Sequence, residues 1–186
     1  MKKSYTLFAA LLLTLTSMAQ LKIQSGAVFF LNNGATVSVD GDVTSFSDIT
    51  GSGTLELKGT TTQNVNMNGY AISANLQINN PANINLGGSA VISGAFNLVA
   101  GKIQMNAYDL TLNGTISNTF DNTRYFITNG NGRLWRNVGV GAANQFTFPV
   151  GADASSYNPV TILENQTADR YGVRCLNKAY NSGSTG

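Results

Sequence analysis

The chain has 186 residues, of which 42% are hydrophobic and 11% charged, with one cysteine and no histidine. Without histidine, every Ser-His and Cys-His nucleophile pair is excluded, and the commonest general base and metal ligand are missing. One cysteine cannot form a disulfide within the chain, so we expect its stability to come from a hydrophobic core and hydrogen bonds.

Residues 1–19 have the features of a secretory signal peptide. A lysine pair precedes an apolar run over residues 7–15, and small residues follow at the spacing of a cleavage site. A membrane-spanning helix needs roughly 20 apolar residues, so a retained anchor is the weaker interpretation. We expect cleavage between Ala19 and Gln20, which leaves a secreted or outer cell-surface chain with no membrane span.

The mature chain is electrically neutral. Two of the eleven basic residues, Lys2 and Lys3, belong to the leader, which leaves nine against nine acidic residues. Nucleic-acid binding needs a clustered basic face, which this balance does not support. All five arginines lie from Arg124 onward. This change near residue 120 predicts two modules, over residues 20–118 and 119–186.

Between residues 35 and 118, short units repeat in which two apolar residues flank a polar one. Examples are TVSVDG, TLELKG, NLQINN and DLTLNG. Such alternation predicts β-strands, and the Gly and Asn that follow favour turns because both tolerate positive φ. No 3.6-residue apolar pattern is sustained, so we expect an all-β fold.

The spacing of these units predicts how the strands stack. Three series recur with a shared period: Val37, Leu55, Leu76, Phe96, Ile116; Phe46, Val65, Ile84, Ile103; and Ile72, Ile92, Leu112. The period, roughly 20 residues, predicts a short right-handed parallel β-helix over residues 20–118, with about four coils of three strands each. Residues 27–31 are expected to cap its N-terminal end. An antiparallel meander, favoured by the Asn-Gly pairs, is the alternative.

The residue between the two apolar positions of each unit should point outward. These outward positions are polar and contain no aromatic residue: Ser38, Glu56, Gln77, Asn97 and Ser117 on one face; Asn66, Asn85 and Gln104 on the second; Ser73, Ser93 and Thr111 on the third. Sugar-binding surfaces usually carry exposed aromatic side chains. We therefore expect ladders of hydrogen bonds between coils here, rather than a ligand face.

The densest carboxylate group consists of Asp40, Asp42 and Asp48. It lacks the ligand spacing and closing Glu of a calcium loop, and it lacks the apolar pocket that raises the pKa of a glycosidase acid. We interpret the three aspartates as solvated turn residues and only weak candidates for ligand binding. No sequence motif predicts a metal, a cofactor or catalytic activity.

A second weak candidate places an aromatic residue between two cations, as a uronate site would: Arg133, Trp135 and Arg136. On an alternating strand, Arg136 lies on the face opposite Trp135, so the two arginines cannot both face the tryptophan. We interpret Trp135 as a core residue with the arginines at its rim.

Three motifs follow residue 125: FPVG at 148–151, YNPVT at 157–161 and YGVRC at 171–175. This pattern resembles a segment of the large secreted surface proteins of gliding Bacteroidota, which the type IX system exports. The resemblance implies a β-sandwich-like module that starts at residue 119, is incomplete by residue 186 and is followed by a further domain of a longer chain. The sorting domain that usually ends such proteins is not among these residues, so the resemblance does not imply type IX export for this chain.

Together these observations predict a non-catalytic, secreted or cell-surface structural module used in adhesion to an extracellular glycan or surface protein. The alternative is a carbohydrate-binding or polysaccharide-degrading β-helix protein, by analogy of fold. A concave face that brings Asp40, Asp42 and Asp48 beside Trp135 or Arg136 would favour this alternative.

Overall fold

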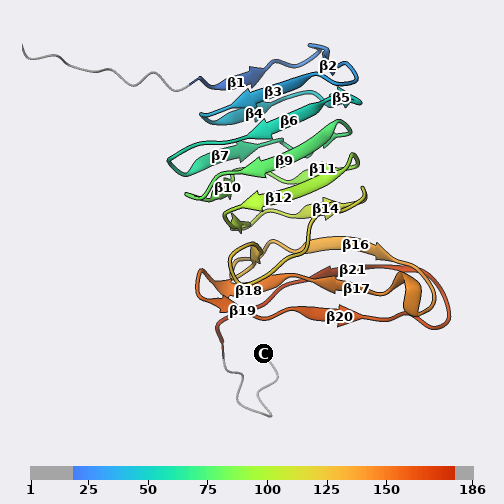
Figure 1. The fold of residues 1–186 in the computed structure, drawn as a ribbon. Coiled ribbons are helices and arrows are strands. Elements are labelled where there is room, and N and C mark those ends of the chain that lie inside the picture. Colours follow the sequence, from blue (N-terminus) through green and yellow to red (C-terminus); the bar gives the residue numbers. More distant parts are fainter. Residues whose placement is uncertain (1–18, 179–186) are drawn as a thin grey trace, which may run out of the picture.

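The computed structural model describes residues 19–178, which form a parallel β-solenoid of about six turns with a small antiparallel sheet at its C-terminal end (Figure 1). The expected signal peptide lies almost wholly outside the described residues. Among residues 19–178, no helix is long and apolar enough to cross a membrane. The all-β, parallel β-helical fold expected from the repeat is confirmed.

Three sheets run along the solenoid, and their neighbouring strands pair in parallel. Sheet A contains β1 (Leu21–Ile23), β4 (Val43–Ser45), β7 (Gln63–Asn66), β10 (Ile84–Leu86), β13 (Ile103–Gln104), β15 (Phe126–Ile127) and β18 (Val150–Asp153). Sheet B contains β2 (Phe29–Leu31), β5 (Ile49–Gly51), β8 (Ala71–Ile72), β11 (Ala90–Ile92), β14 (Leu110–Leu112) and β16 (Leu134–Val138). Sheet C contains β3 (Thr36–Val39), β6 (Thr54–Leu57), β9 (Asn75–Asn79) and β12 (Phe96–Ala100).

The predicted register is confirmed in sheets B and C. Each member of the first series pairs with the next, in the order Val37, Leu55, Leu76, Phe96, Ile116. The third series, Ile72, Ile92, Leu112, also pairs as predicted. These residues stack one turn above another because their side chains share the buried face of each sheet.

The series predicted for sheet A is only partly correct. Ile84 pairs with Ile103 as expected, but Val65 pairs with Leu86 and Val43. Phe46 lies after β4 and is partly exposed. The members of the expected series are each 19 residues apart, whereas the observed pairs Val43–Val65 and Val65–Leu86 are 22 and 21 residues apart in the sequence. Val65 pairs with Leu86, which is the next inward-facing residue of β10 after Ile84. The alternation therefore still places the apolar side chains inside.

The solenoid has about six turns, not the four that the repeat predicted. Residues 29–31 of the expected cap form β2, which pairs in parallel with β5 and is therefore a strand of the first turn. At the other end, β15, β16 and β18 continue the parallel ladders past residue 118. Phe126, Leu134 and Val150 are fully buried and extend the same core, so the ladder has no break at the expected boundary.

The antiparallel strands lie at the C-terminal end of the stack, in orange and red in Figure 1. β17 (Phe146–Phe148) pairs with β20 (Val160–Ile162), β19 (Ser156–Tyr157) pairs with β18, and β21 (Asp169–Val173) pairs with β16. The short 3-10 helix η1 (Ala142–Asn144) precedes β17. The parallel ladders of sheets A and B therefore end in antiparallel strands. The FPVG motif lies where β17 passes into β18.

A single apolar core runs through the turns. It contains fully buried aliphatic and aromatic side chains, among them Ile49, Leu55, Ile72, Leu98, Phe126 and Phe148. The rings of Phe96, Phe120 and Phe126 pack with centroids 5.7 to 6.5 Å apart near the C-terminal end. No single turn encloses its own apolar face, so each turn depends on its neighbours for burial.

We expect Leu98→Ala to destabilise the fold by about 2–5 kcal/mol, because Leu98 is 0% exposed and its truncation leaves a cavity between turns. Its neighbour Val99 is 39% exposed, so Val99→Ala is the matched control and should cost well under about 1 kcal/mol. Urea unfolding followed by circular dichroism measures both. Equal losses in the two variants would contradict the assignment of Leu98 to the core.

Candidate functional site

The three candidate aspartates do not form one site. Asp40 and Asp42 line a small cleft of about 90 Å³ with Gln20 and Gln63, whereas Asp48 lies before β5 at another corner. Asp42 accepts hydrogen bonds from the backbone N–H of Asn64 at 2.8 Å and from its side-chain amide. In residues 19–178, no group of three or more acidic or cysteine side chains is placed to hold a metal ion.

Asp48 has a structural role that its sequence context did not reveal. Its Oδ1 accepts the backbone N–H of Ala71, one turn further along, at 2.8 Å. The same bond from a corner side-chain oxygen to a backbone N–H of an adjacent turn recurs at Asn83 to Lys102, Asn118 to Leu98 and Asp109 to Arg133, and Asn75, the first residue of β9, makes it to Ala95. The Asx residues between strands therefore join successive turns as well as bending the chain.

The outward face of sheet C carries the predicted polar ladder. Ser38 Oγ donates to Glu56 Oε2 at 2.5 Å, Gln77 Nε2 donates to Glu56 Oε1 at 3.0 Å, and Asn97 Nδ2 donates to Gln77 Oε1 at 3.3 Å. The hydrogen bond from Ser38 is the largest cause of the lowered pKa of Glu56, which burial opposes. The ladder built on this ionised carboxylate thus joins four successive turns, and these groups already bond to one another.

Two buried amide side chains, those of Asn80 and Gln63, were not predicted from the sequence. Asn80 is 0% exposed, and its Nδ2 donates to the side chain of Gln63 at 2.8 Å and to the Thr61 carbonyl at 2.9 Å. Gln63 Nε2 donates in turn to the carbonyls of Val39 and Gly41. Bonds to other turns satisfy both amides, which is the condition for burying them at low cost. Their only sequence signal is an amide at a position where an apolar residue is expected.

Trp135 lies on the outer face of β16, because its neighbours Leu134 and Val138 alternate with it and are fully buried. The prediction that Trp135 belongs to the core is therefore wrong. The guanidinium groups of Arg170 and Arg133 lie 4.6 and 5.9 Å from its ring centroid. Trp135 Nε1 is buried and has no hydrogen-bond partner in residues 19–178.

Arg136 points to the opposite side of β16, as the alternation predicted. Its guanidinium lies 4.5 Å from the centroid of Phe146 and donates to the carbonyls of Leu112 and Gly114 at 3.1 Å. Burial lowers the pKa of Arg136. Arg133, Trp135 and Arg136 therefore do not converge on one ligand. Gly172 and Arg170 cover the Trp135 ring, on which a sugar would otherwise stack.

A wider cleft, of about 480 Å³, lies at the corner between sheets C and A. Three successive turns line it, through Pro81 and Asn83, then residues 99–102, then Thr123 and Arg124. No sequence pattern indicated this cleft, because its side chains come from unrelated corner segments of different turns. The candidate residues Asp40, Asp42, Asp48, Arg133, Trp135 and Arg136 are not among those that line it.

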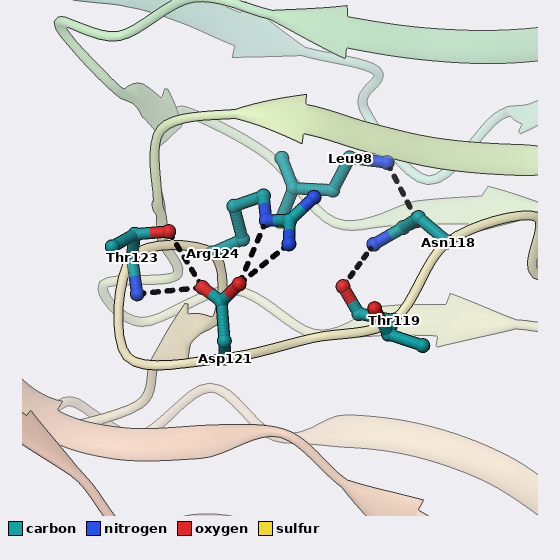
Figure 2. Close-up of polar contacts among 6 residues, drawn as sticks. All are labelled: Leu98, Asn118, Thr119, Asp121, Thr123 and Arg124. Carbon is teal, nitrogen blue, oxygen red and sulfur yellow. Dashed lines mark hydrogen bonds and ion pairs between the residues drawn. The ribbon is translucent and has the colours of Figure 1, made fainter.

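Thr123 and Arg124, which line this corner cleft, belong to the loop over residues 118–125. Figure 2 shows the polar contacts of this loop. Asp121 accepts hydrogen bonds from the backbone N–H and hydroxyl of Thr123, and from Nε and Nη2 of Arg124. The bond from Arg124, followed by those from Thr123, holds the pKa of Asp121 well below its usual range. Asn118 ties the start of the loop to the preceding turn by accepting the backbone N–H of Leu98.

Comparison with protein-family models, with curated proteins and with solved structures gave no match. The part of the resemblance that the structure supports is the β-solenoid fold. Membership among the surface proteins of Bacteroidota stays a prediction from the three motifs.

Gly172→Ala should destabilise the protein by about 1–3 kcal/mol, because a Cβ there would lie 2.6 Å from Cε2 of Trp135. Trp135 is the only tryptophan, so its fluorescence reports the displacement directly. Gly87→Ala is the control, because its Cβ would lie 3.4 Å from its nearest neighbour, in ordinary contact. Unchanged fluorescence and stability in Gly172→Ala would show that the ring does not lie against this glycine.

Asp121→Asn should lower stability at neutral pH by up to about 1 kcal/mol, since it removes a partly exposed ion pair. The folded-state pKa of Asp121 is depressed, so its contribution is fully present above the unfolded value, about 3.9, and is lost progressively as the pH falls from there through the depressed folded-state pKa. Wild type and variant should therefore converge in acid.

Thermal unfolding from neutral pH down to about pH 2 measures this, with the gap expected to begin to narrow below about pH 4 and to keep narrowing as the pH falls. Asp48→Asn serves as the control, because an amide oxygen can accept the same N–H of Ala71. A stability gap for Asp121→Asn that stays constant into acid would refute the role of the ionised carboxylate.

Proposed function

We propose that this protein is a secreted or cell-surface structural module that holds a following β-domain away from its attachment point and takes part in adhesion. The observation that carries the proposal is the continuity of the solenoid. One apolar core and three parallel ladders run through the turns, so the module behaves as one short rod. At roughly 4.8 Å per turn, six turns give a height of about 30 Å.

The surface chemistry supports the same role. Glu56, Gln77 and Asn97 bond to one another along sheet C, and the corner residues bond to backbone groups of adjacent turns. Side chains engaged in this way stiffen the rod and have few free donors for a ligand. A neutral mature chain is also consistent with an extracellular glycan or a surface protein as partner, rather than a nucleic acid.

A carbohydrate-binding role is the second candidate, and the corner cleft of about 480 Å³ favours it. Polysaccharide degradation has weaker support. Asp40 and Asp42 lie beside the first turns, whereas Trp135 and Arg136 belong to β16, near the other end of the solenoid in Figure 1. The concave arrangement that would favour an enzyme is therefore not formed by these residues.

An export assay tests the proposed location of the protein outside the cytoplasm. Expressed with its own leader in a Gram-negative host, the chain should leave the cytoplasm, and mass spectrometry should find a mature N-terminus at Gln20. Leu12→Arg interrupts the apolar run and is the control that should keep the chain inside. A wild-type chain that stays in the cytoplasm at full length would contradict a secreted function.

Adhesion is tested with beads that carry the purified mature chain, in flow over surfaces coated with extracellular polysaccharide. The proposal predicts retention above that of beads carrying the same chain after heat unfolding, because display requires the folded rod. Equal retention of folded and unfolded chains would contradict it.

A further inference from the structure

The solenoid departs from its regular repeat at the corner cleft. Val99 is an extra residue in β12, where the pairing with β9 shifts register, and its side chain is 39% exposed. In sheet A, the stretch of chain from Ile103 to its partner Phe126 is longer than the stretch from Ile84 to its partner Ile103. The additional residues form the loop at 118–125 that walls the cleft. Bulges and added loops of this kind commonly aim side chains at a binding site.

Two cations from successive turns line the cleft. Lys102 follows the turn at Gly101, and its Nζ lies 5.3 Å from the centroid of the Tyr125 ring. It forms no ion pair with any residue in 19–178. Arg124 bonds to Asp121 through Nε and Nη2, which leaves the donors on Nη1 outside this pair. With Asp121 counted against Arg124, the cleft keeps one uncompensated positive charge, on Lys102.

The remaining lining combines apolar and polar surface. Pro81 and Val99 present carbon atoms, while Asn83 and Thr123 add an amide and a hydroxyl. This mixture suits a ligand that has a C–H face, hydroxyl groups and a carboxylate. A polyphosphate or a nucleic acid would gain from the lysine but would have no use for the aliphatic surface, and Tyr125, which is fully buried, offers no ring for base stacking.

The floor of the cleft is fixed before any ligand arrives. Asn83 has φ of 79° and accepts the backbone N–H of Lys102 through Oδ1 at 2.8 Å. Gly101 has φ of 85°, and a Cβ there would lie 2.0 Å from the carbonyl oxygen of Asn80. A preformed backbone at the lysine reduces the entropy lost on binding.

We propose that the corner cleft binds a carboxylated sugar residue of an acidic polysaccharide, with Lys102 and Arg124 on the carboxylate and Pro81 and Val99 against the sugar ring. This inference rests on the proposed adhesion function and names the class of glycan that it would engage.

Isothermal titration of the mature chain with a short oligogalacturonate tests the site. Wild type should bind, and Lys102→Met should weaken binding about tenfold, as expected for one charge-assisted contact. Lys22→Met is the matched control, because Lys22 lies on β1 of the first turn, and it should leave the affinity unchanged. Thermal unfolding of both variants checks that the fold is retained.

Two further ligands separate the alternatives. The methyl-esterified oligogalacturonate keeps the sugar ring and loses the charge, so it should bind about tenfold more weakly than the free acid. Inorganic polyphosphate of similar length should also bind more weakly. Polyphosphate binding as tight as the uronate, with the same dependence on Lys102, would overturn the assignment to a sugar. Equal binding of wild type and Lys102→Met would overturn the site.

The outcome is separable from that of the proposed function. A chain that is exported and retains beads, yet shows no affinity for oligogalacturonate, keeps its adhesive role and loses only this ligand. A chain that binds oligogalacturonate through Lys102 but is never exported keeps the site and loses the surface role.

Discussion

No turn of this molecule can bury its apolar face without the turns on either side. Each strand has only two to five residues, which is too little for an isolated sheet, and its inward side chains contact those one turn away. The core is therefore shared along the axis, and every other feature depends on the turns staying in register. The antiparallel strands at the C-terminal end matter for the same reason. They pair with the last parallel strands of sheets A and B, so these strands do not present a free edge to which a further parallel strand could add.

Polar residues enforce this register at the corners and on one face. Side-chain oxygens of Asp48, Asn83 and Asn118 accept backbone N–H groups from adjacent turns. Glu56 accepts from residues one turn before and one turn after it. Polar side chains that look like ligand-binding groups in the sequence therefore form hydrogen bonds to other turns of the fold. The corner cleft keeps these bonds at Asn83 and Asn118, but the bulge at Val99 and the loop at 118–125 border it, and Lys102 has no acidic partner there among residues 19–178.

The repeat period was sufficient to predict the fold, the three-strand coil and the register of two sheets. It succeeded in sheet C because the residues of the series occupy the same position in each alternating unit, and every step from Val37 to Ile116 pairs as expected. It failed in sheet A, where the expected series took an equal step throughout. It also failed past residue 118, where the steps from Ile103 to Phe126 and from Phe126 to Val150 lengthen to 23 and 24 residues. Trp135 was misassigned because its hydrophobicity suggested the core, while the alternation around Leu134 placed it outside. The cleft could not be predicted, since its lining comes from separate turns and depends on side-chain packing at a bulge.

Hydrogen–deuterium exchange tests the continuity of the stack most directly. If one core and one set of ladders unite the turns, the amides of β6, β12, β15 and β18 should show similar protection and lose it together as denaturant is added. Exchange of β15 and β18 well before β6 and β12, as a separate unit that begins near residue 119, would contradict a continuous solenoid and the rod-like module built on it.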